Sequence, residues 1–287
     1  MRTTSRKIMV VGSGAREHAL ARALARSGSV AEVVVLPGNA GTVAAAAPGF
    51  AAIRRRALAA GLTVEAIVEA ARAEQPDLVV IGPEAPLVAG VVDALEVEGI
   101  LAFGPKKDAA ILEGSKAFLK ALAAREGIPT AGFVTVTSFE AAEAHIRKHG
   151  APIVVKASGL CAGKGVVVAT SEAEALEAAR AMLVDGVFGE AGRTVVLEET
   201  LRGEEASVLA ICDGERTFVL PAARDHKRVG DGDTGPNTGG MGAFAPSGNL
   251  PPALLARVER EIIGPTLAGM KRDGRTFRGV LFAGLMI

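Results

Sequence analysis

A stretch near the end of the chain, DHKRVGDGDTGPNTGGMGAFAP from Asp225 to Pro246, sets charged side chains among six glycines. Such a composition suits binding of a charged small molecule, because glycine lets the backbone approach a ligand closely and adopt positive φ. Neither a helical nor a strand period fits this stretch. A long irregular loop is uncommon in a compact domain unless it binds something or is disordered. We therefore expect a ligand-binding loop here.

A second stretch, KASGLCAGKG, places Lys156 and Lys164 around a glycine-rich segment. It resembles a nucleotide-binding P-loop but departs from that motif, because only three residues separate Gly159 from Gly163 and Lys164 is followed by Gly165 instead of Ser or Thr. The apolar runs on both sides indicate two antiparallel strands. The segment is then either a flap whose backbone N–H groups close over phosphates or a mobile hairpin turn.

The run VVLEETLRGEEAS supplies Glu198, Leu201 and Glu205 where a strand passes into a loop. At such a strand end, a backbone N–H and C=O can pair with an adenine edge while a carboxylate accepts hydrogen bonds from ribose hydroxyls. Acidic residues on a solvated turn would give the same pattern. The combination of this run with Lys116, Lys156 and the glycine-rich segment favours the nucleotide-binding interpretation.

The first turn of the chain, Gly12-Ser13-Gly14, invites a dinucleotide-binding interpretation. It departs from that fingerprint, because Glu17 stands where a third glycine is needed and no acidic residue follows the second apolar run at Leu36. A tight turn or a different phosphate site fits better.

The elements that must position these groups alternate in the first hundred residues. Short apolar runs bounded by Gly or Pro predict buried strands, and runs with apolar residues at helical spacing predict helices between them. This alternation predicts a doubly wound parallel sheet with ligands at the carboxyl ends of its strands. The predicted strands are 8–11, 33–36, 78–81 and 100–103, and the predicted helices are 16–27, 64–75 and 89–98.

From Glu113 onward the pattern indicates an α+β unit. We expect one helix through LEGSKAFLKALAAREGIP, ended by Gly127 and Pro129. Strands are expected at 151–156, 165–169 and 194–199, with a helix at 172–183. The basic run from Arg54 to Arg56 is interpreted as solvated surface.

Composition limits the function classes. The 287 residues are 49% hydrophobic and balance 32 basic against 32 acidic side chains, a globular profile without a net field toward nucleic acid or membrane. No apolar run has the roughly 18 to 20 residues of a membrane span, and no signal-peptide core opens the chain. We expect a cytoplasmic protein. Two cysteines, Cys161 and Cys212, make neither a disulfide framework nor a metal cluster.

Together these motifs resemble one enzyme family. GSGAREHAL, PGNAG, GPEAPLVAGVVD, LEGSKAF, KASGLCAGKGV, EETLRGEEAS and the Asp225–Pro246 stretch are similar to the phosphoribosylamine–glycine ligases, or glycinamide ribonucleotide synthetases, of the ATP-grasp superfamily. The resemblance implies an α/β domain at 1–112 and an ATP-grasp domain at 113–287, with 125–202 as a mobile lid. It also implies that ATP drives ligation of glycine to 5-phosphoribosylamine through glycyl phosphate, a reaction of positioning and charge neutralisation.

The resemblance also implies site residues, in three groups. The expected ATP-binding residues are Lys116, Lys156, Gly163, Lys164, Gly165, Glu198, Glu199, Leu201 and Glu205. The expected phosphoribosylamine pocket comprises Gly14, Arg16, Glu17, Pro37, Gly38, Asn39, Gly41, Gly82, Pro83 and Glu84, with Thr238, Gly239, Gly240 and Met241 as further substrate-binding residues. Asp225, Lys227, Asp233 and Asn237 are expected to hold glycine and phosphoribosylamine in line with the γ-phosphate, while His226 serves as a hydrogen-bonding residue or, alternatively, as a base.

The chain also departs from the family pattern. The family's Mg²⁺ ligands, a Glu and an Asn, come after the point where GVLFAGLMI ends, so no metal ligand is assigned within these residues. We expect ATP and Mg²⁺ as cofactors, a monomer or weak dimer, and weak or absent turnover by the 287 residues alone. Part of the family's ATP-grasp fold is expected beyond Ile287. The alternatives are another ATP-grasp ligase or an ATP-binding module without turnover.

Overall fold

The computed structural model describes residues 5–59, 61–161, 163–232 and 234–287, apart from the side chains of Lys227, Pro236 and Asn237. The chain divides into two compact units, Met1–Ala110 and Ile111–Ile287, two residues before the boundary expected from the sequence. Within the described part of the chain, no helix is long and apolar enough to cross a membrane.

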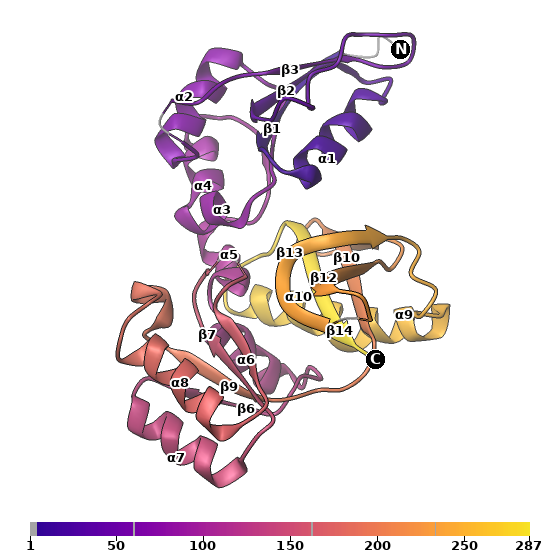
Figure 1. Ribbon diagram of the computed structural model, residues 1–287. Coiled ribbons are helices and arrows are strands. Elements are labelled where there is room, and N and C mark those ends of the chain that lie inside the picture. The colour runs from indigo at the N-terminus through magenta and orange to yellow at the C-terminus, as the bar shows by residue number, and fades with distance from the viewer. Residues whose placement is uncertain (1–4, 60, 162, 233) are drawn as a thin grey trace. The chain divides into compact units, whose positions relative to one another are not determined.

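The first unit is built on a five-stranded sheet in the order β3-β2-β1-β4-β5, in which every pair is parallel (Figure 1). This confirms the predicted doubly wound parallel sheet. The elements are β1 (Arg6–Gly12), α1 (Ala15–Ala25), β2 (Val30–Pro37), β3 (Ala52–Arg55), α2 (Val64–Glu74), β4 (Leu78–Ile81), α3 (Glu84–Ala89), α4 (Val91–Val97) and β5 (Ala102–Phe103).

Both faces of this sheet are buried, which explains its continuously apolar strands. On β1, Met9 and Val11 pack with α2 and α4, while Ile8 and Val10 pack with Ala21 and Ala25 of α1. Figure 1 shows α1 on one side of the sheet and the other helices on the opposite side. Successive strand residues thus serve opposite cores.

Two predictions for this unit are corrected. The expected helix at 89–98 is α4, which begins only at Val91, because Gly90 takes φ +97° and separates it from α3, a helix that the sequence did not predict. The basic run at Arg54–Arg56 belongs to an edge strand and its continuation, where Arg54 and Arg56 pair with the buried Glu74. The sequence did not reveal this, because the acidic partner lies eighteen or more residues away.

The second unit contains a four-stranded sheet in the order β6-β9-β7-β8, with antiparallel pairing. Helices α7 and α8 cover one face through a core that includes Ile146, Val155, Met182 and Leu197. Its elements are β6 (Phe133–Val136), α7 (Phe139–His149), β7 (Ile153–Ala157), β8 (Val166–Ala169), α8 (Glu172–Leu183), the 3₁₀ turn η1 (Gly189–Gly192) and β9 (Val195–Glu199).

The helix expected through LEGSKAFLKALAAREGIP is broken at Ser115 into α5 (Lys107–Gly114) and α6 (Lys116–Glu126). Ser115 is extended, and its hydroxyl accepts from the N–H of Phe118 as the N-cap of α6. Gly127 ends α6 in the left-handed conformation, as the sequence predicted. The break places Lys116 at the first position of the new helix.

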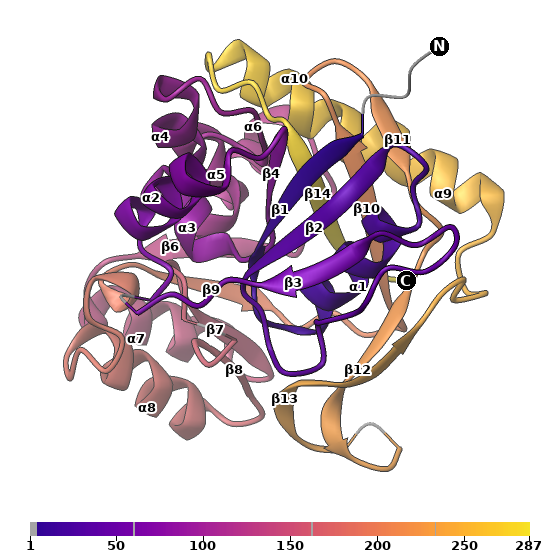
Figure 2. The same cartoon turned by 90° about the horizontal axis from the view of Figure 1, so that it is seen from above.

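The rest of the unit is a three-stranded sheet, a hairpin and a helical segment, visible in Figure 2. The sheet order is β11-β10-β14, and β12 and β13 form the separate hairpin. The elements are β10 (Glu205–Cys212), β11 (Thr217–Val219), β12 (Arg224–Gly230), β13 (Thr234–Phe244), α9 (Pro252–Val258), the π-helical turn η2 (Glu259–Ile263), α10 (Gly264–Arg272) and β14 (Gly279–Met286).

The hairpin corrects a central expectation, because most of the stretch from Asp225 to Pro246 is paired strand and not an irregular loop. Arg224 pairs with Phe244 and Gly230 with Thr234, with register shifts between these positions. Backbone pairing needs no side-chain alternation when neither face packs on a core. A glycine-rich sequence with irregular register therefore hides the period on which strand prediction depends.

Candidate functional site

The start of α6 is tied to the segment that follows β7. The N–H of Lys116 donates to Ser158 O at 2.8 Å, and the N–H of Ala117 donates to Ser158 Oγ at 3.1 Å. Lys116 Nζ then donates to Gly159 O at 3.1 Å. Burial lowers the pKa of Lys116 below its ordinary value, and the positive charge of Lys156 adds to this effect. The lysine is thus held beside the glycine-rich segment as a partly desolvated cation.

A second lysine comes from the sheet itself. Lys156 on β7 and Glu198 on β9 lie on the face opposite α7 and α8, since Val155 and Leu197 beside them face those helices. The register pairs Val154 with Glu198 and Lys156 with Val196, so the two charged residues are diagonal neighbours. Lys156 Nζ donates to Glu198 Oε2 at 2.7 Å.

A third lysine joins them from α6. Lys120 lies four residues after Lys116, on the same side of the helix, and its side chain is 7% exposed. Its ammonium lies 3.3 Å from the same Oε2 atom of Glu198. Burial lowers the pKa of Lys120, while Glu198 opposes that change. Two ammonium groups therefore share one carboxylate oxygen, and Lys116 lies one helical turn before Lys120, an arrangement that favours binding of an anion.

The glycine-rich segment links two antiparallel strands, as predicted, because β7 pairs antiparallel with β8. Gly163 takes φ +79°, with open space where a Cβ would lie. Lys164 is exposed, and its N–H donates to Cys161 O at 2.9 Å. Gly165 is buried, and a Cβ there would lie 2.7 Å from Cys161 Sγ. The lack of a side chain at Gly165 thus lets the segment fold back against Cys161.

The residues expected to bind adenine and ribose follow β9. The Glu199 carboxylate accepts from the N–H of Gly132 at 2.8 Å, which ties the end of β9 to the chain before β6. Leu201 is 45% exposed. Glu205 begins β10 and is half-buried. The nucleotide-binding roles of these residues stay predictions.

In the first unit, two strand-end segments, 12–14 and 82–84, meet at Glu17, which is 3% exposed. The Glu17 carboxylate accepts from the N–H of Gly14 at 2.8 Å and from Arg16 Nε at 2.7 Å. A Cβ at Gly12 would lie 2.4 Å from Glu17 Cγ, and one at Gly82 would lie 2.1 Å from its Oε1. In a dinucleotide-binding fold, glycine leaves room for the helix to pack closely on the strand. Here the Glu17 side chain fills that space.

Arg16 spans two of these segments, because Nη1 donates to Glu84 Oε1 at 2.8 Å. Partial burial acts to lower the pKa of Arg16, but the hydrogen bonds that its guanidinium donates to Glu17 and Glu84 raise that pKa above its ordinary value. Asn39 Nδ2 donates to Ser13 O at 2.8 Å, and Asn39 Oδ1 accepts from the N–H of Gly41. The structure thus brings the predicted residues at 14–17, 37–41 and 82–84 into one cluster, of which Glu17 is the buried support.

The hairpin residues are placed less completely. Asp225 accepts from Ser207 Oγ of β10 at 3.3 Å, and His226 stacks on Phe244 with ring centroids 6.0 Å apart. Gly240 donates its N–H to Thr238 Oγ1 at 3.0 Å, Met241 is 58% exposed, and Gly239 lies in β13. Asp233 and the side chains of Lys227 and Asn237 lie outside the described residues. Of these contacts, the one from Asp225 ties β12 to β10.

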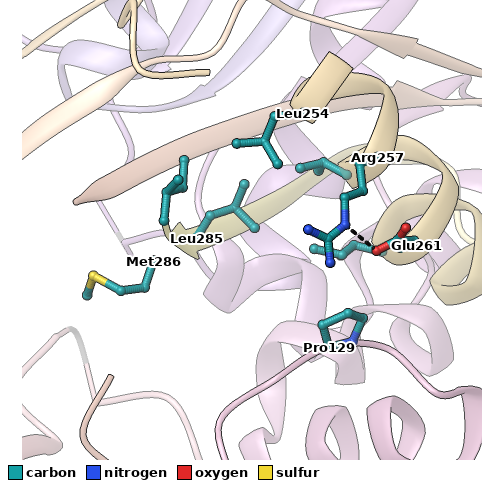
Figure 3. A pocket seen from close by; sticks show the side chains of 9 residues that line it. Pro129, Leu254, Arg257, Glu261, Leu285 and Met286 are labelled. Carbon is teal, nitrogen blue, oxygen red and sulfur yellow. Dashed lines mark hydrogen bonds and ion pairs between the residues drawn. The ribbon is translucent and has the colours of Figure 1, made fainter. Parts of the chain in front are cut away.

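A pocket of about 320 Å³ lies elsewhere in the second unit, between α9, η2 and β14 (Figure 3). Leu254, Leu285, Met286 and Pro129 give it apolar walls, and Arg257 and Glu261 form an ion pair of 2.7 Å at its side. None of the site residues predicted from the sequence lines this pocket. The candidate site consists of loops and a charged sheet face instead.

Comparison with known proteins decides the family. The N domain of phosphoribosylglycinamide synthetase matches residues 6–113, and the ATP-grasp (A) domain of the same family matches residues 114–287. The chain belongs to the phosphoribosylglycinamide synthetase family. The two matches together cover residues 6–287, so both units of the chain belong to the family fold.

Relatives agree with this assignment. The phosphoribosylamine–glycine ligase of Xanthomonas axonopodis pv. citri is 52% identical over 281 residues, which cover 98% of this chain and 64% of that protein. The enzyme of the same name from Escherichia coli O6:H1 is 50% identical over 282 residues. The chain thus spans about 64% of the length of the curated relatives it matches.

Solved structures show the same fold. A phosphoribosylamine–glycine ligase from Thermotoga maritima matches with a TM-score of 0.79 at 34% identity, covering 98% of this chain and 65% of that chain. A biotin carboxylase from Campylobacter jejuni, solved as a complex with β,γ-ATP, matches with a TM-score of 0.74 at 17% identity. The latter likeness concerns the fold alone.

The described donors fit ATP better than they fit a metal. The positive charge of Lys156 helps to lower the pKa of Lys116, and an anion beside Lys116 would offset that effect. Among the residues that the structure describes, no group of three His, Cys, Asp or Glu side chains could hold a metal ion.

Sequence reasoning missed two residues of this site. Lys120 carried a signal, because its spacing of four from Lys116 puts both on one side of a helix. Ser158 carried none, since its role is to bind backbone and hydroxyl groups at the start of α6. Its partners lie more than forty residues away in sequence.

Proposed function

We propose that this chain supplies the nucleotide- and substrate-binding surfaces of an ATP-dependent ligase that joins glycine to 5-phosphoribosylamine. A carboxylate oxygen of glycine attacks the γ-phosphorus of ATP, and the bond to the bridging oxygen breaks to release ADP. The amine of phosphoribosylamine then attacks the acyl carbon of glycyl phosphate. Phosphate leaves, the amine loses a proton, and glycinamide ribonucleotide results.

The observation that carries this proposal is that Lys120 and Lys156 share the carboxylate of Glu198, while Lys116 binds Gly159 O in the glycine-rich segment. Phosphoryl transfer needs fixed positive charge and backbone donors more than it needs a protein nucleophile. We assign the ATP phosphates to Lys116, Lys156 and the N–H groups of residues 163–165. Residues 125–202 act as a lid over the nucleotide.

The second substrate is assigned to the first unit. The Arg16 guanidinium and the loops at 37–41 and 82–84 suit the phosphate and ribose of phosphoribosylamine, since guanidinium binds phosphate in a fixed geometry. Asp225, Lys227, Asp233 and Asn237 are assigned to the alignment of glycine and phosphoribosylamine with the γ-phosphate. Family membership supports these assignments.

The test is the substrate dependence of ADP release by the purified protein, followed with a coupled assay in the presence of Mg²⁺. ADP release is expected only when both glycine and phosphoribosylamine are present, whatever its rate, and bicarbonate is expected not to replace glycine. ATP is also expected to raise Tm, because a ligand that binds the folded state stabilises it. ADP release that ignores glycine, or no effect of ATP on Tm, would contradict the proposal.

A further inference from the structure

Lys120 is a buried cation whose three ammonium hydrogens all have acceptors. Its Nζ donates to Thr130 Oγ1 at 2.7 Å and to Ala131 O at 3.3 Å, and it lies 3.3 Å from Glu198 Oε2. The ring of Phe133 lies 5.3 Å away, within the range of a cation–π contact. These contacts fix the ammonium in place, so its charge acts from a defined position.

The partner of Lys120 is shared. Glu198 Oε2 also accepts from Lys156 Nζ at 2.7 Å, so one oxygen atom serves two ammonium groups. The side chains of Lys120 and Glu198 are each 7% exposed, whereas that of Lys156 is 26% exposed. The three side chains together retain one positive charge, and Lys156 is the member most able to present it to a ligand.

We propose that Lys120 is a positioning residue that keeps Lys156 available to nucleotide phosphates by competing with it for Glu198. Without Lys120, Glu198 and Lys156 would form a neutral pair, and a phosphate would have to break that pair in order to bind Lys156. With Lys120 present, Glu198 keeps a buried cation when Lys156 turns to the phosphate. This inference rests on the proposed nucleotide site and adds a residue to it.

A purely structural role makes a different prediction. Lys120 also joins α6 to residues 130 and 131, so a purely structural role predicts that its loss loosens the unit and weakens the binding of every ligand. If Lys120 acts through its charge, its loss weakens the binding of phosphate-bearing ligands selectively, and removal of the Glu198 carboxylate reverses that effect. Comparing ATP with uncharged adenosine separates the two roles.

The experiment is isothermal titration of the purified protein with ATP and with adenosine at fixed salt and Mg²⁺. Lys120→Met is expected to raise the Kd for ATP on the order of tenfold, because one nearby charge is lost, and to change the Kd for adenosine less than about twofold. The double variant Lys120→Met with Glu198→Gln restores the single positive charge. It is expected to return the Kd for ATP to within about threefold of the original value.

Glu198→Gln alone supplies an independent measurement if Lys120→Met does not fold. It removes the anion that competes with phosphate, so the Kd for ATP is expected to fall about two- to threefold. The inference is overturned if Lys120→Met weakens the binding of ATP and of adenosine equally, or leaves ATP binding unchanged. It is also overturned if the double variant binds ATP no better than Lys120→Met does, or if Glu198→Gln weakens ATP binding. If the unaltered protein binds adenosine but does not prefer ATP, the proposed phosphate site itself fails, which is a separate result.

Discussion

Glu17 is the side chain around which the strand-end segments of the first unit close. Its carboxylate binds Gly14 and Arg16, and its methylene and carboxyl atoms fill the space beside Gly12 and Gly82. A larger residue at either glycine would meet a side chain that is already buried and bonded. Glycine is thus required at both positions because the Glu17 side chain leaves no room for a Cβ, whether or not a ligand also needs that space.

Gly82→Ala is expected to destabilise the first unit by about 2 kcal/mol, because overpacking a filled site typically costs about 1–3 kcal/mol. Urea unfolding measures the change, and Gly28→Ala is the matched control, since open space surrounds Gly28. Glu17→Ala should remove most of the cost of Gly82→Ala in a double-mutant cycle. Additive effects of the two substitutions would show that the Glu17–Gly82 contact does not carry the cost.

At this scale the sequence predicted which residues gather but not how they interact. The loops at 14–17, 37–41 and 82–84 were expected together because parallel strands end at one edge of a sheet. That Glu17 is a buried support, and that Arg16 binds Glu84, depend on side-chain geometry across 68 residues. No local pattern records such a pair.

Among the elements, β3 shows how a charged edge strand is held. Arg54 and Arg56 both bind the Glu74 carboxylate at the end of α2, and Lys7 of β1 lies 3.6 Å from it. Hydrogen bonds from Arg54, helped by Arg56 and opposed by burial, lower the pKa of Glu74 to about 2 from an ordinary 4.5. The basic run of β3 is therefore part of a folded ion-pair network.

This network gives a pH dependence. A carboxyl whose pKa is depressed on folding stabilises the fold above its ordinary pKa and loses that contribution as the pH falls toward the folded value. Glu74→Gln is expected to lower the free energy of unfolding by about 2 kcal/mol near pH 7. This value is smaller than the pKa shift alone would give, because solvent screens the partly exposed arginine partners. The difference should shrink between pH 4.5 and pH 2.

Urea titrations across this pH range measure the effect. Glu69→Gln, on the exposed side of the same helix, is the matched control and should change the unfolding free energy by less than about 0.5 kcal/mol throughout. A difference for Glu74→Gln that stays constant from pH 7 to pH 2 would show that charge is not its cause.

The hairpin marks the limit of prediction at the element scale. The helices α2 and α8 and the strands β4 and β9 lie within about two residues of their expected bounds, because apolar residues recur there at helical or strand spacing. In β12 and β13, six glycines and scattered charges leave no period, and register shifts prevent one from forming. Pairing there rests on backbone groups, which side-chain patterns do not report.

On the scale of the whole molecule, each unit carries its own set of the groups to which we assign binding. The first provides Arg16 and its surrounding loops, and the second provides the lysines around Glu198. The sequence predicted the two-part α/β and ATP-grasp architecture, and the family match confirms it. The chemistry itself was predicted from resemblance, since spacing alone allowed a flap, a turn or a solvated acidic run.

The measurement that tests the central proposal most directly is isotope transfer from glycine to phosphate. The protein is supplied with ATP, Mg²⁺, phosphoribosylamine and glycine that carries ¹⁸O at both carboxylate positions. The ¹⁸O content of the products is measured by mass spectrometry. Passage through glycyl phosphate predicts one ¹⁸O in each phosphate released and one retained in glycinamide ribonucleotide. Unlabelled phosphate accompanying ADP would mean that water, not glycine, accepts the γ-phosphoryl group, and would contradict the proposed ligation.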